Sequence, residues 1–150
     1  MSLDPTSQKY NFYYSLKKYI IDNLSAVEGI LPIFDKFLPP DKSVSRWLFV
    51  KQGILDLGTL SNYDFKIYCV HRQDYEGDRL TELVDIVKGY FSSDTTKTDG
   101  LIRIPFYSAA TGSALGSMVI TDCMESDSAD APDQSKFLVL SIIAKMASII

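Results

Sequence analysis

Residues 63–91 constrain the fold most strongly, because a strand pattern changes there into a helical one within a few residues. In "YDFKIYCVHR" (63–72), every second residue from Phe65 to Cys69 is apolar, which predicts a strand with one core face. In "DYEGDRLTELVDIVKGYF" (74–91), apolar residues recur at three- and four-residue steps, which predicts an amphipathic helix. The apolar positions of that helix are Leu80, Leu83, Val84, Val87 and Phe91.

The other patterns place strands and one more helix around this unit. A helix is predicted over 4–24, with Asp4 as N-cap and Pro5 in the first helical position. Its expected apolar stripe is Tyr13, Leu16, Ile20 and Leu24. The further expected strands are 27–37, 45–53, 101–107, 117–124 and 136–146. Turns or loops are expected at 38–43, 57–62, 92–100, 108–116 and 125–135.

This order predicts one α+β domain over 1–150, a mixed, mostly antiparallel sheet of about six strands on two helices. Pro32 cannot donate to a strand ladder, so 27–37 should lie at a sheet edge or a bulge, and Pro105 weakens 101–107. In 45–53, Trp47 and Phe49 share one face, and Leu48 and Val50 share the other. Both faces are apolar, which is typical of a strand covered on two sides.

Composition argues against several classes of protein. The 150 residues carry a net charge of −4, which argues against a nucleic-acid footprint. Cys69 and Cys123 stand apart in apolar or alternating runs and indicate core residues of a reducing compartment. The start has no signal-peptide pattern, and the 14-residue apolar run 137–150 is shorter than the roughly 20 residues of a membrane span.

The stretch "HRQDYEGD" (71–78) is where a histidine meets carboxylates. His71 and Asp74 could act as a general base, with Glu76 and Asp78 beside them. Asp74 also precedes the second helix, where an aspartate accepts hydrogen bonds from first-turn amides. We favour the helix cap. No catalytic, cofactor or metal motif is found elsewhere, so neither a cofactor nor a metal is predicted.

The run 63–91, "YDFKIYCVHRQDYEGDRLTELVDIVKGYF", resembles the tail terminator (tail-completion) proteins of long-tailed bacteriophages. Its strand ends in a basic residue, an acidic and aromatic turn follows, and an amphipathic helix closes the unit. A helical start, two preceding strands and a long closing strand agree with the same family pattern. The family has no motif residues to transfer, so no catalytic site is assigned.

The resemblance implies a non-enzymatic subunit that closes into a ring, commonly a hexamer. Such a ring caps the last tube-protein ring of a finished tail, stops polymerisation and offers a surface to the head connector. It would lie in the virion at the head-proximal end of the tail, after assembly in the host cytoplasm, with DNA only passing through its lumen. The loops 108–116 and 125–135 would become ordered against the tube or connector.

A ring needs a heterologous interface, for which the strands 45–53 and 136–146 offer two-sided apolar surface. The candidate assembly contacts are Arg72, Asp74, Glu76, Asp78, Trp47, Arg103 and Lys145. Two alternatives stay open. One is another head–tail joining or tube subunit, and the other is a small enzyme or ligand-binding domain that uses His71 with the nearby carboxylates.

Overall fold

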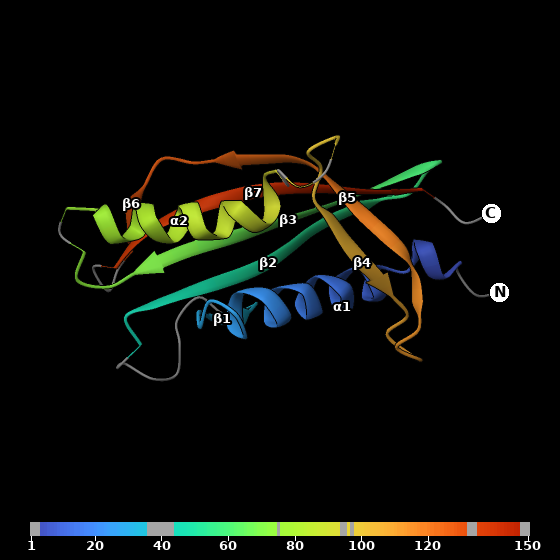
Figure 1. Cartoon of the computed structure of the whole chain (residues 1–150), viewed down its shortest axis with the longest axis horizontal. Helices are drawn as coiled ribbons and strands as arrows, with labels where there is room; N and C mark the ends of the chain where they lie inside the picture. The colour runs from blue at the N-terminus through green and yellow to red at the C-terminus, as the bar shows by residue number, and fades with distance from the viewer. Residues whose placement is uncertain are drawn as a thin grey trace.

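The structure is a computed structural model that describes residues 4–35, 44–74, 76–93, 96, 98–131 and 135–147. Its sheet has the strand order β1-β2-β3-β7-β5-β4, and the short β6 also pairs with β7. Only β1 and β2 run parallel among these pairs, and the others are antiparallel. The predicted α+β class, with a mixed sheet and two helices, is confirmed (Figure 1). The strands are β1 (Leu31–Phe34), β2 (Arg46–Asp56), β3 (Leu60–His71), β4 (Arg103–Tyr107), β5 (Ala114–Glu125), β6 (Ala129–Asp130) and β7 (Lys136–Ala147).

The N-terminal helical segment has three parts. A 3-10 turn, η1 (Pro5–Ser7), precedes α1 (Lys9–Ile20), and a π-helical turn, η2 (Ile21–Ser25), follows it. The Asp4 carboxylate accepts from the Thr6 amide at 2.8 Å, so the predicted cap is confirmed, although it caps η1. The predicted stripe is wrong at one position, because Phe12 is fully buried where Tyr13 was expected. Tyr13 lies at the rim and donates to Asp35.

The strand predicted over 27–37 is shorter than expected. Gly29 adopts φ +67°, a left-handed conformation that glycine tolerates, and this ends the helical segment. The Ile30 amide then donates back to the Leu24 carbonyl at 3.0 Å, as in a helix-terminating turn. The residues before Leu31 therefore belong to that turn, and β1 begins only at Leu31. The rest of the prediction, 36–37 and the turn 38–43, lies outside the described residues.

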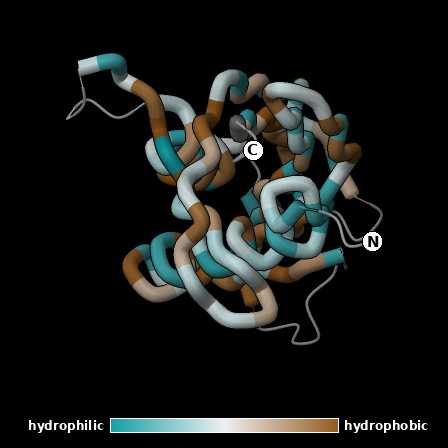
Figure 2. The backbone as a smooth tube through the Cα atoms, turned by 90° about the vertical axis from the view of Figure 1, so that its right-hand side faces the viewer, coloured by the Kyte–Doolittle hydropathy of each residue, from teal (hydrophilic) through white to brown (hydrophobic). Residues whose placement is uncertain are grey.

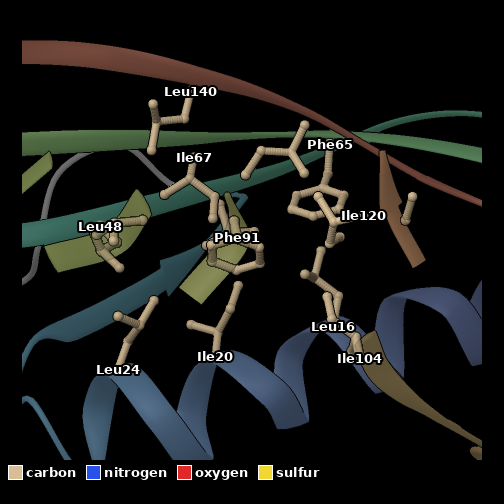
Figure 3. Close-up of a cluster of buried hydrophobic side chains, with 14 of the residues drawn as sticks. Leu16, Ile20, Leu24, Leu48, Phe65, Ile67, Phe91, Ile104, Ile120 and Leu140 are labelled. Atoms are coloured by element: carbon tan, nitrogen blue, oxygen red, sulfur yellow. The ribbon is translucent and has the colours of Figure 1, made fainter. Parts of the chain in front are cut away.

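The predicted second helix is confirmed as α2 (Asp78–Phe91). All five of its predicted apolar positions are buried. They meet the inward residues of β3 and those of α1 in one core, where Phe65 and Phe91 lie between Leu16 and Leu140 (Figure 3). Both helices therefore cover the same face of the sheet.

The centre of the sheet is the antiparallel pair β3–β7, in which all 12 residues of each strand take part. Phe65, Ile67 and Cys69 point into the core as predicted. Hydrophobic and hydrophilic residues are interspersed at short intervals along the backbone (Figure 2). The strand over 136–146 is confirmed as β7. Three loops are shorter than expected: β3 begins at Leu60, β5 at Ala114, and β6 lies within 125–135.

The two sheet edges are β1 and β4, the strands that contain Pro32 and Pro105. Two buried polar side chains of α1 lie against the β4 end. The Ser15 hydroxyl accepts from the Tyr107 amide at 2.8 Å, and the Asn11 carboxamide oxygen accepts from the Ala109 amide at 2.9 Å. Buried amides without a partner are costly, so these bonds fix α1 along this edge.

We predict that Ser15→Ala destabilises the protein, because it leaves the Tyr107 amide without its acceptor. An unpaired buried donor costs about 1–3 kcal/mol, whereas the better helix propensity of alanine returns about 0.5 kcal/mol. Urea denaturation should therefore show a lower free energy of unfolding for this variant. Ser117→Ala, on the exposed part of β5, is the control and should leave stability unchanged. Equal stabilities for both variants would contradict the proposed role.

Candidate functional site

The acidic corner at 71–78 is built as a helix cap. Gly77 occupies the N-cap position of α2 with φ 83° and has no side chain to offer. Asp74 performs that role from three residues upstream, because its carboxylate accepts from the Leu80 amide at 2.7 Å and the Arg79 amide at 3.3 Å. The sequence interpretation of Asp74 as an acceptor for first-turn amides is confirmed, although α2 starts at Asp78.

The Asp74 carboxyl is held in its ionised form. Burial by itself raises its pKa, but the amides of Leu80 and Arg79 and the nearby His71 outweigh that effect, so the pKa lies below the ordinary value. Because the pKa of Asp74 is lower in the folded than in the unfolded state, its carboxylate stabilises the fold at pH values above the ordinary pKa of aspartate, about 4. This stabilisation is lost as the pH falls toward the folded-state pKa.

We predict that Asp74→Ala lowers the free energy of unfolding by about 1 kcal/mol at neutral pH, the usual value of a helix cap. The difference from wild type should shrink at about pH 3, because the wild-type carboxylate is then losing its charge. Urea titrations at both pH values test this. Asp78→Ala, in the same turn but exposed, serves as control, and a difference that does not change with pH would refute the charged cap.

His71 is 6% exposed on the core-facing side of β3, and its Nδ1 lies 2.7 Å from the Arg72 carbonyl oxygen. A hollow of about 410 Å³ does exist at this corner, and Glu76 and Asp78 line it. His71 does not line it. Histidine and carboxylates therefore do not converge on one concave site here. Among the described residues, no group of three or more histidine, cysteine, aspartate or glutamate side chains could hold a metal ion.

Arg72 and Trp47 are in contact, although the sequence predicts them on two different strands, 63–72 and 45–53. The Arg72 guanidinium lies 4.8 Å from the centre of the Trp47 ring, and its Nη1 donates to the Val44 carbonyl at 3.2 Å. Trp47 is fully buried. This cation–π pair joins the end of β3 to the start of β2.

The face of the sheet that the helices leave uncovered carries an apolar region and a charged region. Phe49 packs on Tyr68 with ring centres 4.9 Å apart, and Tyr68 stacks on Phe137 at 6.0 Å. These three side chains are half-buried. The predicted division of 45–53 into two apolar faces is thus confirmed, but the described helices cover only the face of Leu48 and Val50.

Arg103 and Lys145 both belong to the charged region of this face. The cross-strand register sets Arg103 beside Val119, and Val119 beside Lys145. Arg103 bonds Asp99 at 2.6 Å, and this hydrogen bond lowers the pKa of Asp99 to about 2. Lys51 and Lys66, which the sequence did not single out, face each other directly on the same side.

The β2–β3 hairpin carries a cluster of exposed apolar side chains that sequence reasoning missed. Ile54, Leu57 and Leu60 are 66%, 52% and 56% exposed. A register shift between Gln52 and Leu55 bends β2 just before this tip. The hairpin reaches the end of the molecule where both termini lie, opposite the 71–78 corner (Figure 1). The available signal was "GILDLGTL" (53–60), an apolar run within a turn.

Comparisons with known proteins support the fold and do not identify a family or a function. No protein-family model matches the sequence, and no curated protein matches it. Ten chains of solved structures match, and one of them has a TM-score of 0.60 at 10% identity over 92% of this chain and 94% of that chain. Its name is a bare identifier that describes no function. In the part of the chain that is described, no helix is both long and apolar enough to cross a membrane.

Proposed function

We propose that this protein is a structural subunit that forms a ring, hexameric in its expected form, on the end of a completed phage tail tube. The ring stops tube polymerisation and provides the joining surface for the head. Its partners are other copies of the chain, the tail tube protein and a head-completion or connector protein. It acts in the virion after assembly in the host cytoplasm, and DNA only passes through its lumen.

The apolar tip of the β2–β3 hairpin is the observation that carries this proposal. Three large side chains, those of Ile54, Leu57 and Leu60, are more than half exposed at the tip of one hairpin. Scattered apolar residues on a surface are ordinary, but a group on a projecting hairpin favours a protein contact. The tip lies at one end of an elongated molecule, where it can reach the next subunit (Figure 1).

The uncovered sheet face gives further support. A ring subunit has to present two different surfaces, because each copy contacts its neighbours head to tail. The hairpin tip and the sheet face with Phe49 and Tyr68 are continuous through Ile54, and together they can serve as one of these two surfaces. The sequence resemblance to tail terminators over 63–91 is the reason for proposing this particular assembly, a ring on the end of a tail tube.

Two other functions are distinguished by what they predict. A tube subunit would polymerise into long tubes, whereas a terminator gives discrete rings. An enzyme that uses His71 would lose activity on His71→Ala while its fold stays intact. The buried position of His71, outside the hollow that Glu76 and Asp78 line, makes the enzyme the weaker candidate.

We predict that replacing Ile54, Leu57 and Leu60 together with serine abolishes capping and ring formation without loss of the fold. The reason is that exposed side chains contribute little to the stability of the subunit itself. Native mass and sedimentation across a concentration series, with and without purified tail tubes, measure assembly. Electron microscopy of tube ends then reports capping.

Val27→Ser is the matched control, because Val27 is 69% exposed but lies away from the hairpin, before β1. It should cap tubes as the wild type does. A triple variant that still forms rings on tube ends would contradict the role of the hairpin. A wild-type protein that stays monomeric and ignores tubes would contradict the proposed function itself.

A further inference from the structure

The uncovered sheet face contains a groove of about 360 Å³ next to the hairpin tip. Its walls include Ile54, Met124 and Ile143, and of these Ile54 and Met124 are 66% and 60% exposed. The groove is thus continuous with the apolar tip through Ile54. A surface of this kind is suited to an extended segment of another protein.

Lys51 and Lys66 stand opposite each other in this groove on neighbouring antiparallel strands. Directly opposed like charges destabilise a strand pair. Among the residues that the structure describes, neither lysine side chain has an ion pair or hydrogen bond, although Asp64 also lines the groove. The two lysines and one aspartate leave a net positive groove that a carboxylate can complement.

We propose that this groove binds the acidic segment 125–131 of a second copy of the chain, with Asp127 of that copy between Lys51 and Lys66. The segment reads "ESDSADA", and 125–130 are exposed. Glu125 and Asp130 already bond Lys88 and Lys136. Within the described chain, Asp127 has no such partner, and the small residues beside it allow close approach.

The register excludes the same contact within one chain. Lys66 lies beside Ser141 of β7, whereas the acidic segment runs along the other side of β7 near Val139 and Phe137. With strand spacings of about 4.8 Å and rises of about 3.3 Å per residue, Asp127 lies on the order of 10 Å from Lys66 both along and across the strands. Only a second copy can bring the two charges together.

This inference rests on the proposed function, because it identifies the surfaces that join neighbouring ring subunits. The groove and the acidic segment are different surfaces, so repeated head-to-tail pairing generates a ring if the rotation closes. The apolar tip beside the groove would be covered by the same neighbour. Charge pairs inside such a contact set specificity and orientation.

Zero-length cross-linking with a carbodiimide tests the contact directly. The reagent joins an amine to a carboxylate in contact, so a mixture of nitrogen-15-labelled and unlabelled full chains separates links between copies from links within one copy. We expect mixed-label peptides that join Lys51 or Lys66 to Asp127. Their absence, in samples that assemble with or without tail tubes, overturns the proposed contact.

Charge-reversed variants test its contribution to assembly. Lys66→Asp and Asp127→Lys should each weaken self-association at least about tenfold, and the doubly reversed chain should recover most of it. Lys18→Asp changes net charge equally on the exposed side of α1 and should have no such effect. Equal weakening by Lys18→Asp, or no rescue by the double variant, overturns the proposed pair.

The outcomes separate this inference from the proposed function. Rings that cap tubes but are insensitive to Lys66→Asp retain the function and reject the groove. A two-fold dimer that shows the predicted cross-links retains the groove contact and rejects the ring. Cross-links from Lys66 to another protein only would identify a different occupant and reject the second copy.

Discussion

The burial of one face of β3 against both helices is the constraint on which the rest of the structure depends. Phe65 and Ile67 meet Phe91 of α2 and Leu16 of α1 in a single core. The helices cover only this face of the sheet, so side chains of opposite parity point away from the helices. For this reason Phe49 and Tyr68 pack on each other on the far side of the sheet from the helices. Lys51 and Lys66 face each other on the same side.

The sequence pattern predicted the fold correctly wherever a structural feature depends on residues that are close together in the sequence. The five apolar positions of α2 follow from the 3.6-residue repeat, and Pro32 correctly placed β1 at a sheet edge. Tyr13 failed as a core residue because Phe12, one position away, fits the same wide stripe without a polar group to satisfy. Gly29 shortened β1 through a backbone conformation that no hydrophobic pattern encodes.

The candidate site was predictable in part for the same reason. Asp74 could be recognised because a helix cap acts over a few residues. Lys51 and Lys66 could not, since they are 15 positions apart and meet only through a register that contains a shift at Gln52. The exposure of Ile54, Leu57 and Leu60 likewise depends on how far the hairpin extends beyond the core, which is a property of the assembled sheet.

The contacts of Ser15 and Asn11 with the end of β4 have a consequence for aggregation. An exposed strand edge is a template on which other chains can add by backbone pairing, and proteins commonly block such edges. Here two side chains of α1 occupy the Tyr107 and Ala109 amides, while Pro105 removes another donor from the same segment. This chain therefore exposes apolar side chains while backbone-mediated fibril growth from β4 is obstructed.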